Sequence, residues 1–201
     1  MDTLLFTHMH QDHYIALPSL LFYFLNALHD ASGLTIYGPE DVEDIVGQAL
    51  IFAGKERHYQ QVAPPTVVRV KAGMRLELKD LAVECIDSRH AAPGLCYRFE
   101  DPQTGKSAVY SGDTEYFEGL AAFAKGADVL IHEASRGPRC PADRPNTARH
   151  SSAEDAARTA RNAGVGTLYL VHCSPSLEIL EAARGIFSNA YQPKPGETIR
   201  V

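Results

Sequence analysis

The chain lacks several features that would assign it to a whole class of proteins. None of its apolar runs reaches the roughly eighteen residues that a membrane-spanning helix needs. The best candidate, residues 17–28, is too short and contains Pro18 and Asn26. No basic and then apolar segment opens the chain, as a secretory signal peptide would. We therefore expect a protein with no membrane span and no export signal.

Positive charge and paired cysteines are also scarce. The formal charge of −6 argues against broad, non-specific binding to nucleic acids, although it leaves room for a local basic patch. The four cysteines, Cys85, Cys96, Cys140 and Cys173, form no C-x-x-C pair. Without an export signal, they indicate reduced thiols and a cytoplasmic location. We expect Cys85, Cys96 and Cys173 in the core, because their neighbours are apolar.

The composition is that of an ordinary globular domain of 201 residues, 45% of them hydrophobic and 22% charged. Apolar runs of strand length alternate with helical patterns, without a linker or repeat. Strands are expected at 4–7, 34–39, 66–70, 75–88, 95–101, 107–113, 128–134, 167–174 and 197–201. Helices are expected at 17–29, 40–52, 114–127, 151–164 and 176–187, the fourth opening with a capping box of Ser151 and Glu154 and closing on Gly164. This order predicts a single α/β domain over residues 1–201.

Polar side chains recur where the predicted strands end. They are His8, His10, His90, Asp113, His132, Glu133 and His172. Ligands of α/β proteins gather at the carboxyl ends of strands, so these positions indicate one shared site. His29 and His58 have no such placement and are interpreted as ordinary surface histidines. His132 is expected to be structural, because in a strand it faces away from its neighbour Glu133.

The stretch FTHMHQDH carries three histidines and an aspartate in the six positions from His8 to His13. His8 and His10 face the same side in extended backbone. Asp12 and His13 follow a turn, so their side chains can point toward a second metal position. Imidazole and carboxylate donors suit Zn²⁺, Mn²⁺ or Fe²⁺. Four donors on one short loop do not easily share one tetrahedral ion, so the motif predicts two ions. Their remaining donors are expected to be His90, His172 and, as a bridge, Asp113.

With these residues in view, THMHQDH resembles the signature of the metallo-β-lactamase superfamily of metallohydrolases. The further stretches ALPSLL, YSGDT, IHEAS, RHSS and LVHCS resemble its ribonuclease Z-like branch, and the resemblance runs from His8 to about Ser174. It implies an αββα sandwich with a dinuclear site at one edge. It also implies one zinc on His8, His10 and His90, a second on Asp12, His13 and His172, and Asp113 between them.

The same resemblance assigns catalytic roles. Asp12, Glu133 and His150 are the predicted catalytic residues, Asp12 being a metal ligand as well. A hydroxide held by the metals would attack the substrate, and His150 would protonate the leaving oxygen while Glu133 fixes its tautomer. The alternative is that Glu133 and His150 only hold the ligands in place.

The chain departs from the family in two respects. The family usually carries further strands ahead of the histidine motif, so we expect an N-terminally shortened sandwich: a fragment, or a domain stabilised as a homodimer. Bacterial transfer-RNA-processing members also carry a long arm between the equivalents of His90 and Asp113, where this chain has 22 residues and a hairpin. Transfer RNA is therefore a weaker expectation than a small-molecule or oligonucleotide phosphodiester.

The stretch SRGPRCPADRPNTARH holds four arginines before His150. It is either an anion clamp at the mouth of the site or a solvated surface loop. The leading function is thus a dinuclear zinc hydrolase of phosphodiesters, with Mn²⁺ or Fe²⁺ as other metals. An arylsulfatase, a carboxylic ester or lactone hydrolase, and an inactive truncated metal-binding domain are the alternatives.

Overall fold

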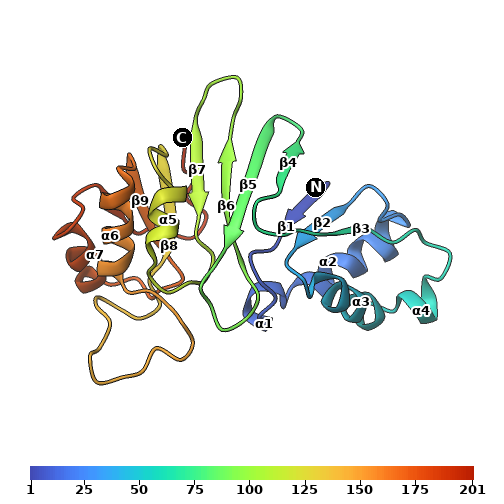
Figure 1. Cartoon of the computed structure of the whole chain (residues 1–201). Helices are drawn as coiled ribbons and strands as arrows, with labels where there is room; N and C mark the ends of the chain where they lie inside the picture. The colour runs from blue at the N-terminus through green and yellow to red at the C-terminus, as the bar shows by residue number, and fades with distance from the viewer. The chain divides into compact units, whose positions relative to one another are not determined.

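The computed structural model describes all of residues 1–201 and divides the chain into two compact units, Met1–Lys71 and Ala72–Val201. Each unit has its own sheet and its own hydrophobic core (Figure 1). The single domain over residues 1–201 stays a prediction. The helices are all too short or too polar to form a membrane span.

The first unit is a three-stranded parallel sheet with helices in its crossover connections. The strands lie in the order β1 (Thr3–Leu5), β2 (Thr35–Gly38) and β3 (Thr66–Arg69). Parallel neighbours cannot be joined by a tight hairpin, so the chain must return between them, usually through helices. Those helices are α1 (Gln11–Tyr14), α2 (Leu17–Tyr23), η1 (Phe24–Leu28), α3 (Val42–Phe52) and α4 (Lys55–His58).

The predicted helix at 17–29 is two elements rather than one. It begins as the α-helix α2, with Pro18 in its first turn, where the missing N–H costs nothing. It continues as the π-helix η1 and ends at His29, whose φ is +52°. Leu21 and Leu25 are fully buried in the core of the unit, as the apolar pattern predicted. Sequence periodicity does not distinguish a short π-helix from a continuing α-helix.

The second unit is a seven-stranded mixed sheet in the order β10-β9-β8-β7-β6-β5-β4. Its strands are β4 (Arg75–Leu78), β5 (Leu81–Asp87), β6 (Leu95–Glu100), β7 (Ser107–Tyr110), β8 (Val129–Glu133), β9 (Thr167–Val171) and β10 (Ala190–Tyr191). Pairing is antiparallel from β4 to β7 and parallel from β7 to β10. Consequently β5, β7, β8 and β9 all run in the same direction.

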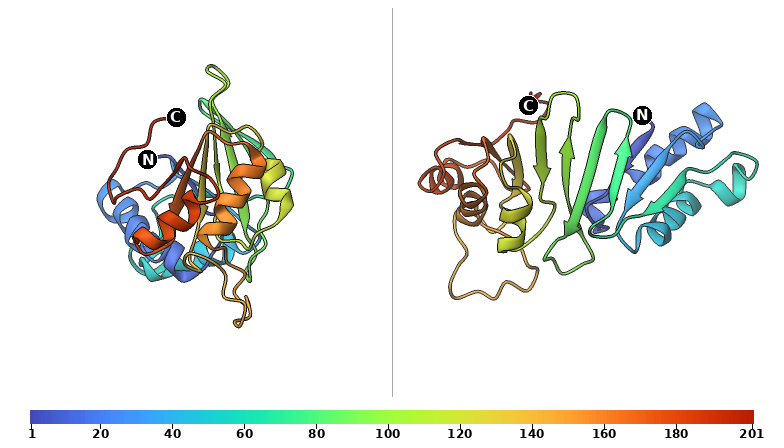
Figure 2. Two further views of the ribbon diagram at one scale, coloured as in Figure 1. Left: turned by 90° about the vertical axis from the view of Figure 1, so that its left-hand side faces the viewer. Right: turned by 45° about the horizontal axis from the view of Figure 1, so that its top comes forward.

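Three helices belong to this sheet: α5 (Glu118–Phe123), α6 (Ala153–Ala163) and α7 (Leu177–Arg184). Helix α6 packs on β8 and β9, and it is flanked by α5 and α7 (Figure 2). Its buried side is made of alanines and Thr159, and such small side chains let the helix approach the sheet closely. Helix α6 ends at Gly164 with a φ of +64°, as predicted.

The capping box of α6 lies one residue later than predicted. Ser152, not Ser151, accepts a hydrogen bond from the Asp155 N–H, and the Asp155 carboxylate accepts one from the Ser152 N–H. Ser151 is occupied elsewhere, because its hydroxyl donates to the carbonyl of Thr114 at 2.7 Å. Glu154 instead accepts from Arg139.

The predicted strand at 197–201 is wrong. The last strand is β10, in which Ala190 lies opposite Leu168 of β9. Beyond it the chain turns at Lys194–Glu197, where the Glu197 N–H donates to the Lys194 carbonyl at 3.0 Å.

The predicted hairpin between β6 and β7 is confirmed, with the Asp101 N–H donating to the Lys106 carbonyl at 2.9 Å. Cys85 and Cys96 are buried, and Cys173 packs at the edge of the core.

Candidate metal centre and catalytic pair

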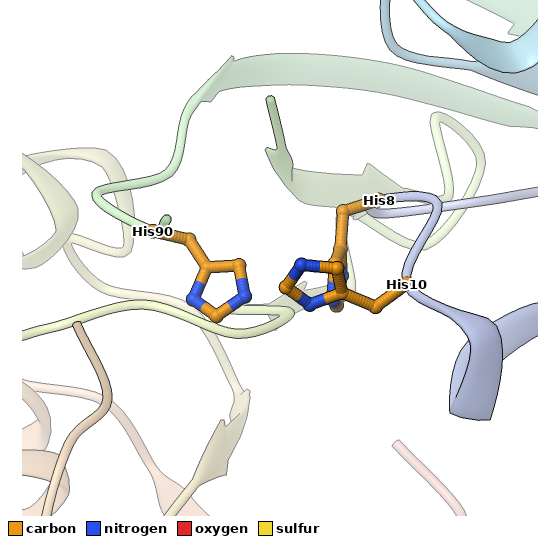
Figure 3. A group of neighbouring side chains, drawn as sticks. All are labelled: His8, His10 and His90. Atoms are coloured by element: carbon orange, nitrogen blue, oxygen red, sulfur yellow. The ribbon is translucent and has the colours of Figure 1, made fainter. Parts of the chain in front are cut away.

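In the first unit, the histidine motif follows the end of β1 and runs into α1. The imidazoles of His8 and His10 lie next to one another, with ring centroids 4.8 Å apart (Figure 3). The short helix α1 then supplies the predicted turn, so that the ring of His13 lies 4.0 Å from that of His8. Asp12 Oδ2 is 3.5 Å from His13 Nε2. The turn thus brings the four predicted donors of this unit together.

In the second unit, the remaining predicted donors follow strands that run in one direction. His90 lies beyond β5, Asp113 beyond β7 and His172 directly after β9, whereas Glu133 is the last residue of β8. The carboxyl ends of such strands meet at one edge of the sheet, which is where α/β proteins place their ligands. One donor atom each from His90, Asp113 and His150 lie within 4.8 Å of one another.

Asp113 directs its two oxygens at two different histidines. Its Oδ1 is 3.4 Å from Nδ1 of His172, and its Oδ2 is 3.8 Å from Nδ1 of His150. His172 itself has a φ of +52°, a left-handed conformation that costs about 1–2 kcal/mol for a residue with a Cβ. Such outliers gather at functional sites, where the surrounding structure holds them in place.

The tautomer of His90 follows from its partner. Its Nδ1 lies 3.4 Å from the carbonyl oxygen of Arg149 (the ring is also drawn in Figure 3). A carbonyl only accepts, so this contact needs the proton on Nδ1 and leaves Nε2 with its lone pair. Nε2 is therefore the ligand atom that His90 can offer to a metal ion.

Glu133 and His150 form a close hydrogen-bonded pair, with 2.7 Å between Glu133 Oε1 and His150 Nδ1. The buried carboxylate also accepts from the N–H of Thr114 at 2.9 Å, the N–H of Ser135 at 3.1 Å and the hydroxyl of Ser135 at 2.8 Å. Burial raises the pKa of Glu133, but the bond with His150 and the backbone N–H groups outweigh it, so the pKa lies below its ordinary value. Glu133 is thus ionised near neutral pH.

The backbone of His150 is held by a residue that sequence reasoning missed. The side chain of Asn146 accepts from the His150 N–H at 3.0 Å and donates to the His150 carbonyl at 2.8 Å. An asparagine in a Pro-rich loop carries no pattern that would single it out. Thr114 and Ser135 were missed for a related reason, since their contributions to Glu133 are largely backbone N–H groups.

His132 is fully buried and belongs to none of the groups of donors that could hold a metal ion. Its Nδ1 lies 2.8 Å from the carbonyl of Glu133. Burial lowers the pKa of His132, so the ring is neutral at pH 7.

The arginine-rich loop divides into two pairs. Arg136 donates to the carbonyls of Pro145 and Arg144, and Arg139 pairs with Glu154. These two side chains brace the loop itself. Arg144 and Arg149 are exposed, and their side chains make no ion pair within the chain.

A family model described as the beta-lactamase superfamily domain matches residues 1–173. The ribonuclease Z of Prochlorococcus marinus is 28% identical to this chain over 250 residues, covering 94% of this chain and 77% of the relative. The ribonuclease Z of Mycobacterium bovis is 30% identical over 194 residues, covering 88% and 69% of the two chains.

Solved structures show the same likeness. The metallo-beta-lactamase fold protein YhfI from Bacillus subtilis superposes with a TM-score of 0.76 at 24% identity, covering 94% of this chain and 73% of that one. The short form of human tRNase Z superposes with a TM-score of 0.68 at 22% identity, covering 87% of this chain and 73% of that one.

Proposed function

The chain belongs to the metallo-β-lactamase superfamily, in its ribonuclease Z-like branch, and we propose that it hydrolyses phosphodiester bonds with two divalent metal ions. The predicted fold class and the predicted resemblance are confirmed by the family model and by the solved structures. An enzyme of this branch is a metal-dependent hydrolase acting on phosphodiester bonds. The number and identity of the metal ions, the ligand set and the catalytic roles belong to our proposal.

If two ions bind, His8, His10 and His90 would hold one, and Asp12, His13 and His172 would hold the other. Asp113 would be a ligand that both ions share. The donor set is rich in imidazole with a few carboxylates, which fits zinc best and leaves Mn²⁺ and Fe²⁺ as alternatives. Two observations support the fit: His90 is left with Nε2 as its ligand atom, and Asp113 presents its two oxygens to different partners.

When bound, two such ions supply an activated water as nucleophile and positive charge for the developing phosphorane-like transition state. The chain itself must then deliver a proton to the leaving oxygen. Glu133 occupies Nδ1 of His150 at 2.7 Å, so Nε2 is the atom of that ring that can face a substrate. Donation from Nε2 requires the imidazolium form, in which the Nδ1–H still bonds to the carboxylate. This short pair is the observation that carries the catalytic proposal.

The proposed substrate is RNA or a smaller phosphodiester. Transfer RNA is the weaker expectation, because only a hairpin separates His90 from Asp113. The alignment with the Prochlorococcus protein runs over 250 positions although this chain has 201 residues, so that relative carries segments without a counterpart here. The homodimer and the cytoplasmic location stay predictions.

The test combines metal content with substrate comparison. The full chain, purified without chelator, is expected to hold about two zinc, manganese or iron ions and to hydrolyse bis-p-nitrophenyl phosphate faster than an aryl sulfate or a lactone. Chelation should abolish turnover, and added metal should restore it. A folded chain without turnover would contradict the proposal, and metal retained by such a chain would favour the inactive metal-binding domain.

A further inference from the structure

A pocket in the first unit lies outside the histidine motif. Its volume is about 280 Å³, and it is lined by His29, Arg57, His58, Tyr59, Gln60, Gln61 and Val62. The lining contains two imidazoles, a guanidinium and two carboxamides, and none of its residues is acidic. His29 and His58 belong to none of the donor groups that could hold a metal ion. The chemistry of the lining suits an anion with hydrogen-bond acceptors, such as a phosphodiester.

The turn that carries this pocket is built by its own hydrogen bonds. Lys55 Nζ donates to the Gln60 carbonyl at 2.9 Å, and Gln60 Nε2 donates to the Glu56 carbonyl. The turn starts at Gly54, whose φ of +87° few other residues adopt. The ammonium group of Lys55 is therefore used to hold the turn together, and the pocket is formed before any ligand binds.

The pocket is also tied to the π-helix. The hydroxyl of Tyr59 donates to Asn26 Oδ1 at 2.8 Å, which joins the α4 turn to η1. The π-helix ends at His29, and the left-handed backbone there turns the chain beside the pocket. Irregular helices of this kind often mark functional positions.

Arg57 and His58 line the pocket, but their side chains take no part in the hydrogen bonds that build the turn. Both side chains are exposed, and neither makes an ion pair within the chain. By contrast, Arg69 of the same unit is paired with Glu43 at 2.7 Å. A free guanidinium beside two imidazoles is well placed to take a phosphate.

The position of the pocket sets a minimum size for a substrate that contacts both the pocket and the histidine motif. Within the first unit, α4 lies at the opposite end of the helical layer from α1, which carries Asp12 and His13 (Figures 1 and 2). A small diester held at the histidine motif cannot reach α4, whereas a polynucleotide can contact both.

We propose that this pocket is an auxiliary site for the backbone of an RNA substrate, with Arg57 as its phosphate ligand. The inference rests on the proposed phosphodiesterase function, whose substrate class it narrows to a polynucleotide.

The test compares Arg57→Gln with the matched control Arg69→Gln, which removes the same charge from a paired arginine of the same unit. The metal-loaded full chain is titrated into fluorescein-labelled phosphorothioate RNA, and fluorescence anisotropy gives the dissociation constant at several salt concentrations. The kcat/KM values for a short unmodified RNA and for bis-p-nitrophenyl phosphate are measured on the same samples.

Arg57→Gln is expected to weaken RNA binding about fivefold or more and to reduce the slope of affinity against salt by about one. The ratio of kcat/KM for RNA to that for the small diester should fall by a similar factor. Arg57→Lys should recover much of the binding, and Arg69→Gln should stay within about twofold of the parent.

Equal effects of Arg57→Gln and Arg69→Gln would overturn the inference. So would an equal loss of binding for adenosine monophosphate and for RNA, because it would identify a free-nucleotide site. Failure of the proposed function looks different: neither substrate would be hydrolysed by the parent chain, whatever the anisotropy shows.

Discussion

Replacing His150 by alanine should slow the reaction by an amount that depends on the leaving group. A ribose alkoxide needs a proton as it leaves, whereas p-nitrophenolate leaves without one. General acid catalysis contributes about 10²–10⁴-fold, so His150→Ala should lower kcat for RNA by that factor. For bis-p-nitrophenyl phosphate the loss should stay below about tenfold, because the proton donor has little to supply there.

Glu133→Gln should cause part of the same loss in kcat for RNA, and it should also lower the free energy of unfolding. The carboxylate accepts four hydrogen bonds, two of them from the N–H groups of Thr114 and Ser135, which lie on different oxygens. A glutamine amide has one accepting oxygen, so one of these N–H groups must face an NH₂ donor. Leaving a buried N–H unsatisfied costs about 1–3 kcal/mol in the free energy of unfolding.

The decisive assay measures both substrates with His150→Ala, Glu133→Gln and the double variant, with metal content as the control. If Glu133 acts through His150, the double variant should be no slower than His150→Ala. Equal losses for RNA and for the nitrophenyl diester would refute the proton-donor role. Loss of metal from His150→Ala would make His150 a ligand instead.

Three further changes test other parts of the structure. Asp113→Ala should abolish turnover and reduce the metal content below two ions per chain by elemental analysis, and retained activity would contradict the bridging role. Gly166→Ala should lower the free energy of unfolding from a denaturant titration by about 1–3 kcal/mol, because its Cβ would lie 2.6 Å from the carbonyl oxygen of Asp128. Ser152→Ala should cost about 1 kcal/mol in the same denaturant titration, because the N-cap bond from Asp155 is lost, whereas no change would contradict the observed capping box.

Much of the candidate site was predictable because strand ends and donor residues coincide in the sequence. Asp113, Glu133 and His172 follow apolar runs of strand length, and parallel strands bring such ends to one edge. The turn after His10 was predictable as well, since a donor pair at positions 12 and 13 cannot continue the alternation of an extended chain.

What the sequence could not predict are features decided by competition between neighbouring residues. By sequence alone, Ser151 and Ser152 are equally good N-cap residues. Ser151 does not cap the helix because its hydroxyl donates instead to the carbonyl of Thr114, which is distant in sequence. The π-helix at Phe24–Leu28 and the division at Lys71 follow from tertiary packing rather than from local periodicity. The strand expected at the C-terminus failed because an alternating pattern does not show whether a neighbouring strand is present to pair with it.

In the second unit, the proposed metal ligands and the proposed proton donor lie on different kinds of element. Asp113 and His172 follow strand ends of a packed sheet, and rigid elements hold ligands more precisely than loops do. His150, in contrast, belongs to a loop that Asn146 fixes only through backbone contacts. Glu133 joins these two parts, because it ends β8, binds the ring of His150 and accepts the N–H of Thr114, the residue after Asp113. The buried carboxylate of Glu133 therefore sets the position of the proposed proton donor relative to the proposed bridging aspartate. Its replacement should for this reason affect stability and rate together.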